Sequence, residues 1–322
     1  MLRRLRIVRS TATAISILAR PAIPVAVPSS EPYRSVFVGG AQRSGTSWVQ
    51  DVLAQAPGVV TSPESHVFER LHARLAGGPR RLRSILAIVW GFDTGPGRTP
   101  VGLHRWITRD ELVVILREAA VRGRNPEEAA GVAVRRVFDC FVARHADRSR
   151  NGSQVPPVLV EKTPSNVHHA AAILDVFPDA TFVQVIRDGR DVCVSHDKRS
   201  IGTGWRNTDR AAQAKLWRSA VEAGRAVAAD PRYRDRVVTI RYERMRADPV
   251  GEAARLFEAT GLDAPDVASA VDATRIERHE GRGDGRHRRR GAVGDWRTEL
   301  SDDDLAVIAA EVGPLLADLG YT

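Results

Sequence analysis

A glycine-containing loop near the N-terminus has the residue types of an anion-binding site. Residues 40–47 read Gly-Ala-Gln-Arg-Ser-Gly-Thr-Ser, which keeps the spacing of the phosphate-binding loop G-x-x-x-x-G-K-[ST] but places Thr46 where that loop has lysine. Backbone amides, hydroxyl groups, Arg43 and the start of a following helix could together hold a phosphate. The same residues are also compatible with an ordinary strand-to-helix turn with polar caps. The loop therefore predicts an anion site, and the absent lysine raises the question of what it binds.

Charged side chains follow two further apolar runs. Lys162 follows residues 158–160 and is one of three lysines in a chain that otherwise uses arginine for its cations. Arg187 opens a charged turn, Arg-Asp-Gly-Arg-Asp, after residues 181–186, and Ser195 comes about two helical turns later. Charged residues are mostly exposed in folded proteins, so each group is also compatible with a solvated surface turn.

Two later stretches add polar and basic groups. Tyr242 and Glu243 follow the apolar residues 237–241. Residues 288–301, Arg-Arg-Arg-Gly-Ala-Val-Gly-Asp-Trp-Arg-Thr-Glu-Leu-Ser, combine a basic cluster with a glycine-flanked turn and Trp296. Taken alone, this stretch is equally compatible with a flexible arginine-rich loop.

The apolar runs themselves predict the strands that position these side chains. Residues 34–39, 158–160, 181–186 and 237–241 are short and nearly continuously apolar, as buried parallel strands are. Helical patterns separate them. This alternation predicts an α/β fold with a mostly parallel central sheet and helices on both faces. Ligands of such folds bind at the carboxyl ends of the strands, where the polar residues lie.

Helix signals occupy much of the remaining chain. Residues 66–150 are mostly helical by pattern, with one helix capped near Thr108, and another helix is expected to begin at a Ser165 cap. Ser301 and Asp304 resemble a capping box at the start of a C-terminal helix. Further helices are expected from Asp191 and over residues 208–231 and 248–260.

The chain is expected to comprise a basic, loosely ordered tail, residues 1–32, and a single domain, residues 33–322. Arg20 and three prolines interrupt the apolar part of the tail. No segment reaches the roughly 18 to 20 apolar residues that a membrane span needs. A short amphipathic helix in the tail would suit contact with a membrane surface or with a neighbouring subunit.

Composition favours a soluble globular enzyme with an anionic ligand. The chain has 322 residues, of which 43% are hydrophobic and 27% charged, and its net charge is +9. Its arginines are spread along the sequence, so a basic pocket for a small, multiply charged anion fits better than nucleic acid, and we expect no nucleic-acid partner. Cys140 and Cys193 are too few for a disulfide scaffold and lack metal-ligand spacing, which favours a reducing compartment.

Three motifs together resemble those of sulfotransferases that use 3′-phosphoadenosine 5′-phosphosulfate (PAPS). "RSGTSW" resembles the 5′-phosphosulfate loop of that family, and "FVQVIRDGRDVCVS" resembles its 3′-phosphate strand-loop-helix. "RRGAVGDWRTELS" resembles the C-terminal R-K-G-x-x-G-D-W element of the cytosolic enzymes. The sequence around residues 36–70 and the segment "VEKTP" are most similar to the tyrosylprotein sulfotransferase branch and its bacterial relatives. The resemblance implies a P-loop NTPase-like sulfotransferase fold.

The resemblance also implies a reaction and its catalytic residues. The sulfuryl group of PAPS would move to a hydroxyl of an acceptor, leaving 3′-phosphoadenosine 5′-phosphate (PAP), and no metal is expected. Counting from Arg43 as in the tyrosylprotein branch places the catalytic base at Glu64, with His66 as the next candidate. Lys162 would stabilise the sulfuryl and leaving oxygens. Arg43 and Ser195 complete the implied catalytic set.

The donor contacts implied by the resemblance fall into three groups. The 5′-phosphate is assigned to Arg43, Ser44, Gly45, Thr46 and Ser47. The 3′-phosphate is assigned to Arg187, Ser195, Arg289, Arg290 and Gly291, with Arg290 standing where cytosolic enzymes usually have lysine. Adenine is assigned to Trp48 and Tyr242.

The sequence leaves the acceptor open among sugars, lipids, phenols and tyrosyl peptides. Helical insertions at about 66–150 and 196–235 are expected to bind it, and Trp90, Trp106 and Trp205 either line its pocket or fill the core. Because bacteria make PAPS in the cytoplasm, a cytoplasmic location is expected.

Two rival functions remain at this point. A P-loop kinase or NTPase would need magnesium ligands and a lysine in place of Thr46. A non-catalytic basic binding protein would show strongly salt-dependent association with nucleic acid and no affinity for PAPS.

Overall fold

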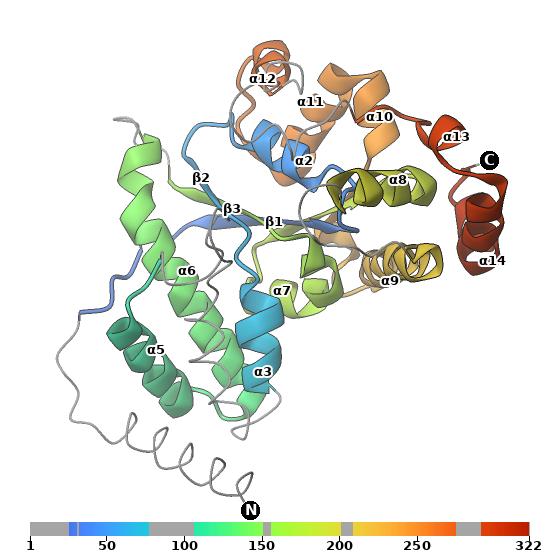
Figure 1. Cartoon of the computed structure of the whole chain (residues 1–322). Coiled ribbons are helices and arrows are strands. Elements are labelled where there is room, and N and C mark those ends of the chain that lie inside the picture. The colour runs from blue at the N-terminus through green and yellow to red at the C-terminus, as the bar shows by residue number, and fades with distance from the viewer. Residues whose placement is uncertain are drawn as a thin grey trace, which may run out of the picture. The chain divides into compact units, whose positions relative to one another are not determined.

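The computed structural model describes residues 26–30, 32–76, 106–150, 156–200, 209–274 and 291–321 (Figure 1). Several predictions concern positions outside these ranges, namely most of the tail, Trp90, Trp205, Arg289 and Arg290. Within the described ranges, no helix is both long enough and apolar enough to cross a membrane.

Within these described ranges, five strands form a sheet in the order β2-β3-β1-β4-β5. Their bounds are Arg34–Gly40 for β1, Val59–Ser62 for β2, Val158–Lys162 for β3, Thr181–Ile186 for β4 and Val237–Arg241 for β5. The pairs β2–β3, β1–β4 and β4–β5 are parallel. The predicted α/β fold with a mostly parallel sheet is therefore confirmed. The sequence-based prediction lacks β2, whose four residues lie between two prolines and are too short to show a pattern.

The chain divides into two compact units. Unit 1 comprises Met1–Ser35, Gly58–Glu161 and Ala172–Asp179, and unit 2 comprises Val36–Pro57, Lys162–Ala171 and Ala180–Thr322. The expected single domain over residues 33–322 remains a prediction.

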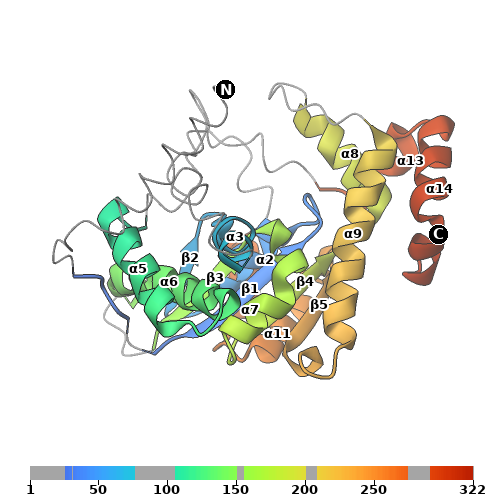
Figure 2. The same ribbon diagram turned by 90° about the horizontal axis from the view of Figure 1, so that it is seen from below.

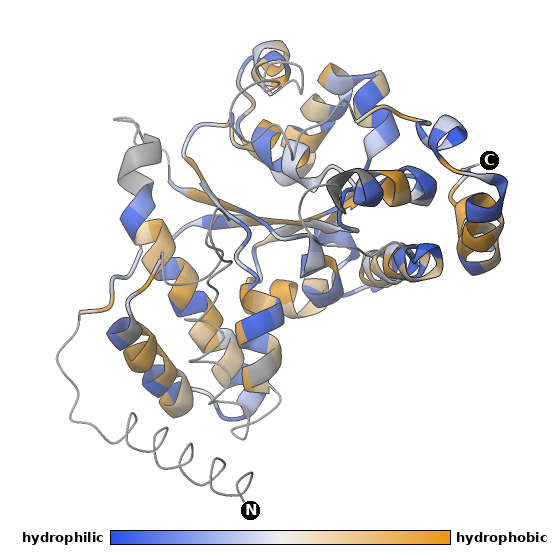
Figure 3. Cartoon of the chain, in the orientation of Figure 1, coloured by the Kyte–Doolittle hydropathy of each residue, from blue (hydrophilic) through white to orange (hydrophobic). Residues whose placement is uncertain are grey.

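Unit 1 is built around helices that pack on one another. They include α3 (Ala73–Ala76), α5 (Arg109–Arg122) and α6 (Pro126–Arg150), with a π-helical turn at Phe68–His72. Thr108 and Glu111 form a capping box at the start of α5, which confirms the predicted cap. Figure 3 shows a hydrophobic and a hydrophilic face along α5 and α6. Trp106 fills the core here, with its ring centroid 4.6 Å from that of Phe141.

Unit 2 places helices on both faces of its strands. Its helices are α2 (Thr46–Leu53), α8 (Gly189–Ser200), α9 (Arg210–Ala229), α10 (Tyr242–Ala247), α11 (Pro249–Thr260), α12 (Val267–Ala273), α13 (Trp296–Glu299) and α14 (Asp302–Asp318). Helices α9 and α11 both contact β5, and Figure 1 shows them on opposite faces. Helix α14 packs beside α9 (Figure 2). These layers leave the carboxyl ends of β1 and β4 side by side.

Two predicted helix starts in unit 2 have different outcomes. Ser301 and Asp304 form the predicted capping box of α14. The predicted Ser165 cap is wrong, because a 3-10 turn over Pro164–His169 precedes α7 (Ala170–Val176) and Thr163 occupies the cap position. Proline suits the first position of a helical turn, so the turn begins before Ser165.

Candidate donor-binding and catalytic site

The loop between β1 and α2 has the geometry of an anion cradle. Gly45 is the N-cap of α2 and has a φ of 93°, a left-handed conformation that favours glycine. A Cβ atom on Gly45 would lie 2.4 Å from the ring of Tyr242, so a side chain is also excluded by space. The amides at the start of α2 therefore lie next to an aromatic ring, with the positive end of the helix dipole beside them.

Arg43 connects this loop to the turn after β4. It has a φ of 72°, and among the described residues only His66 is another non-glycine residue with positive φ. Its Nε donates to Ser195 Oγ at 3.0 Å, and its carbonyl oxygen accepts from Arg187 Nη1 at 3.3 Å. Three residues predicted to bind the sulfuryl donor thus come together from separate elements. The strained backbone of Arg43 lies where they meet.

Arg187 is buried and fixed from several sides. Its Nη2 donates to the carbonyl of Ala292 at 2.9 Å, and its guanidinium lies 4.5 Å from the centroid of the Tyr242 ring. The indole of Trp217 donates to the carbonyl of Arg187 at 2.9 Å, which fixes the backbone as well. Arg187 Nε is buried and has no hydrogen-bond partner within the described part of the chain.

Trp48 and Tyr242, the two residues assigned to adenine, lie together. Their rings meet edge to face, with centroids 6.0 Å apart. Tyr242 donates its hydroxyl to the carbonyl of Gly291 at 2.7 Å, and burial raises the pKa of this phenol. Gly291 is itself an assigned donor residue, so the C-terminal loop reaches the aromatic pair.

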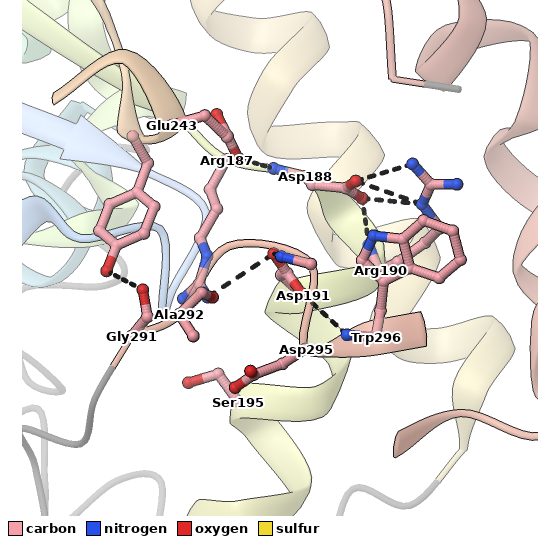
Figure 4. A network of polar contacts seen from close by, with 12 residues as sticks. Arg187, Asp188, Arg190, Asp191, Ser195, Glu243, Gly291, Ala292, Asp295 and Trp296 are labelled. Atoms are coloured by element: carbon pink, nitrogen blue, oxygen red, sulfur yellow. Dashed lines mark hydrogen bonds and ion pairs between the residues drawn. The ribbon is translucent and has the colours of Figure 1, made fainter. Parts of the chain in front are cut away.

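The C-terminal loop is held by residues of the turn after β4 (Figure 4). The carboxylate of Asp191 accepts the amide of Gly294 at 2.8 Å and that of Trp296 at 3.1 Å. The guanidinium of Arg190 lies 3.7 Å from the centroid of the Trp296 ring, and Asp188 pairs with Arg190 at 2.8 Å.

Lys162 lies at the carboxyl end of β3 and is buried, with 6% of its surface exposed. A lysine that is almost fully buried is uncommon unless it has a charged partner or ligand. The alternative of a solvated surface charge is therefore wrong for this residue.

Glu64 belongs to unit 1 and follows β2. Its Oε2 lies 3.5 Å from Nε2 of His66, while Nδ1 of His66 lies 3.1 Å from Oε2 of Glu69. Burial lowers the pKa of His66, but hydrogen bonds to Glu64 and Glu69 outweigh it and raise that pKa to about 9. The imidazole is therefore protonated at neutral pH, with each ring nitrogen facing a carboxylate.

Comparison with known proteins places the chain in a family. Residues 35–266 match the model of the sulfotransferase family. The chain belongs to this family. A protein-tyrosine sulfotransferase of Drosophila melanogaster is 23% identical over 215 residues, which are 66% of this chain and only 35% of that relative. The predicted family assignment is confirmed.

A solved bacterial sulfotransferase has a similar fold. Sulfotransferase STF9 from Mycobacterium avium superimposes with a TM-score of 0.50 at 16% sequence identity, covering 98% of this chain and 82% of that one. Mouse sulfotransferase SULT7A1, solved as a complex with PAP, gives a TM-score of 0.47 at 12% identity and covers 92% of this chain and 91% of that one. The predicted sulfotransferase fold is confirmed by the first of these.

In this sulfotransferase, the structure brings together several of the residues of unit 2 that are predicted to bind the sulfuryl donor. Contacts link Arg43, Ser195, Arg187, Tyr242 and Gly291. The sequence assigned no role to the residues that hold them, chiefly Asp188, Arg190, Asp191, Glu243 and Trp296. Asp191 lies one helical turn after Arg187, and this spacing is the one signal that could have indicated a contact between them.

Other reactive groups lie outside this arrangement. Cys140 and Cys193 are buried free thiols, and burial raises their pKa values to about 11 and about 12. Across the described ranges, no group of three or more histidine, cysteine, aspartate or glutamate side chains is arranged to hold a metal ion.

Proposed function

We propose that this sulfotransferase takes its sulfuryl group from PAPS and transfers it to a hydroxyl of an acceptor. One observation carries the proposal. Among the described residues, Ser44 Oγ, Trp48 Nε1 and Arg187 Nε are buried donors with no hydrogen-bond partner. The family motifs assign these three residues to the 5′-phosphate, the adenine and the 3′-phosphate. Buried polar groups are nearly always paired, and bound PAPS would offer acceptors to all three.

In the reaction, the acceptor oxygen attacks sulfur as the bond from sulfur to the bridging phosphate oxygen breaks. The bonding electrons leave with that oxygen on PAP, and the proton of the acceptor hydroxyl passes to the carboxylate of Glu64. Arg43 and Lys162 neutralise charge on the phosphate and on the sulfuryl oxygens. Catalysis of this kind depends mostly on positioning and on charge stabilisation.

The protonation state of His66 supports Glu64, and not His66, as the base. A histidine whose two ring nitrogens face Glu64 and Glu69 is an imidazolium, which has no lone pair to accept a proton. Glu64 is a half-exposed carboxylate, with 39% of its side chain accessible. It can therefore receive an acceptor hydroxyl while remaining bonded to His66.

For the acceptor, we propose only that its reacting group is a hydroxyl. The relative from Drosophila is a protein-tyrosine sulfotransferase, so a tyrosyl peptide is the first class to test. Sugars, lipids and phenols follow, with the helical segments at about 66–150 and 196–235 proposed to bind them. A cytoplasmic location and a peripheral contact through residues 1–32 are part of the same proposal.

The test combines donor binding with transfer. Calorimetric titration should show that PAP binds and that ADP binds more weakly, because ADP lacks the 3′-phosphate assigned to Arg187. Transfer from sulfur-labelled PAPS is then measured with one acceptor of each class, with ATP and magnesium as the control for a kinase. Absence of PAP binding, or magnesium-dependent ATP turnover in its place, would refute the proposal.

A further inference from the structure

We propose that Asp191 is a positioning residue of the donor site, which holds the loop of residues 291–296 against Arg187 without touching the donor. The inference rests on the proposed function, because it assigns Arg187 to the 3′-phosphate of PAPS. The proposal adds Asp191 to the donor site as a residue that raises the affinity for PAPS by holding its neighbours in place.

Both carboxylate oxygens of Asp191 are engaged by the loop. Oδ2 accepts the amide of Gly294 at 2.8 Å and Oδ1 accepts the amide of Trp296 at 3.1 Å (Figure 4). The side chain is fully buried, with 0% accessible, in the first turn of α8. A buried carboxylate is tolerated only when it is well paired, and here two backbone donors and a nearby arginine supply the pairing.

The same loop is attached at its other end by residues of the donor site. Gly291 accepts the hydroxyl of Tyr242 at 2.7 Å, and Ala292 accepts Arg187 Nη2 at 2.9 Å. The guanidinium of Arg190 covers the ring of Trp296. Between Ala292 and Trp296 the backbone is fixed by Asp191 at two points. Removing these two bonds would leave the backbone between Ala292 and Trp296 without the two contacts that fix it to α8.

Arg187 takes part of its orientation from that loop. Its Nη2 lies 2.9 Å from the carbonyl oxygen of Ala292 and 3.9 Å from the carboxylate of Asp191. The guanidinium is planar and rigid, so fixing Nη2 also fixes the direction of Nε, the atom that has no partner in the described structure. If the loop moves, Arg187 loses the bond at Nη2 and keeps the longer bond from Nη1 to the Arg43 carbonyl, so the direction of Nε–H is less well fixed.

The role calls for an aspartate specifically. Two amides approach from the loop, and a carboxylate offers acceptors on both oxygens, whereas an asparagine of the same shape offers one. Asp191→Asn should therefore release one amide and also remove the negative charge beside Arg187. Asp191→Ala should release both amides.

The experiment compares wild type, Asp191→Asn and Asp191→Ala, with Asp263→Ala as a control for loss of one exposed carboxylate. Three quantities are measured: the dissociation constant of PAP by calorimetry, hydrogen exchange in peptides covering residues 291–297, and kcat and KM for PAPS. We expect PAP binding to weaken about tenfold in Asp191→Asn and more in Asp191→Ala. Exchange at the loop should accelerate in the same order, with kcat at saturating PAPS within about twofold of wild type.

Each outcome decides the proposal. Unchanged PAP affinity and unchanged loop protection in Asp191→Ala would overturn it, as would a fall in kcat at unchanged KM. If Asp191→Ala does not fold, the isosteric Asp191→Asn carries the comparison. Wild-type protein that binds no PAP would refute the proposed function and with it the effect on donor affinity, while the exchange data would still support or overturn the holding of the loop by Asp191.

Discussion

The turn after β4 and the segment after β2 both carry predicted functional residues, but they are held in opposite ways. The turn, Arg187–Asp191, is buried and bonded to residues more than 100 positions away, such as Gly294 and Trp296. The segment, Glu64–Glu69, is partly exposed, and the imidazole of His66 faces carboxylates two and three residues away. The turn is held by side chains and backbone groups distant in sequence. The charges around His66 come from neighbouring residues, and one tertiary bond, from the Ser65 amide to Glu161 Oε1 at 3.1 Å, anchors that segment.

This difference matches two chemical tasks. A sulfuryl donor with several phosphate groups is recognised by hydrogen-bonding groups held at fixed distances. Buried side chains that bond to one another provide such groups. A general base needs the correct protonation state and access to an acceptor, which a half-exposed carboxylate beside an imidazolium provides. We therefore expect substitutions in the turn to change donor affinity, and substitutions in the segment to change turnover or its dependence on pH.

The largest expected effect is that of Glu64→Ala on turnover. Loss of the base should lower kcat by about 100-fold or more, while PAP binding stays within about twofold of wild type. The measurement is steady-state sulfuryl transfer together with calorimetric titration of PAP. Glu69→Gln is the matched control, because Glu69 also bonds His66 but is not assigned to the chemistry. Near-normal turnover in Glu64→Ala would show that Glu64 is not the base, and the contrast between the two regions would then fail.

The next effect is that of Arg187→Ala on donor affinity. It removes a buried charge assigned to the 3′-phosphate, so we expect the dissociation constant of PAP to rise about 100-fold, corresponding to roughly 2 to 3 kcal/mol. Arg225→Ala serves as the control, because the ion pair of Arg225 with Asp318 is exposed to solvent. An equal loss of affinity in both variants would show general electrostatic attraction instead of a specific contact.

A smaller effect is expected from the pH dependence of the contact between His66 and its two carboxylates. The folded-state pKa of about 9 lies above the ordinary value of 6.5. The ion pairs should therefore contribute full stability below about pH 6.5 and lose it as pH rises through about 9. Because both carboxylates are more than a third exposed, we expect His66→Gln to cost only about 1 kcal/mol at pH 6. Thermal unfolding of both proteins at pH 6, 8 and 10 measures this, and a difference that does not shrink with pH would contradict the assignment.

The contrast also explains how much could be predicted from the sequence. The strand of residues 181–186 and the capping box of Ser301 and Asp304 are local patterns, and the structure reproduces both. Glu64 is identified as the base only through the resemblance to the tyrosylprotein branch, by its distance in sequence from Arg43. The bond between Arg43 and Ser195 spans 152 positions, and no local pattern encodes it. Asp191 was missed for the same reason, because in sequence it is one charge among four in a turn.

The smallest expected effect tests whether the hydrogen-bond network of the turn after β4 extends to the residues that follow the last helix. Tyr321, just after α14, donates its hydroxyl to Oε2 of Glu243 at 2.9 Å, and Oε1 of Glu243 accepts the amide of Asp188 at 2.8 Å.

Tyr321→Phe removes one part-buried hydrogen bond, so we expect a loss of about 1 kcal/mol in unfolding free energy and a two- to threefold weaker binding of PAP, on the order of 0.5 kcal/mol. A double-mutant cycle with Glu243→Gln should show coupling between the two positions, because they share one carboxylate. If the two effects on PAP binding simply add, the C-terminal residues stabilise the fold without positioning the turn, and the tertiary network that fixes the donor site ends at Glu243.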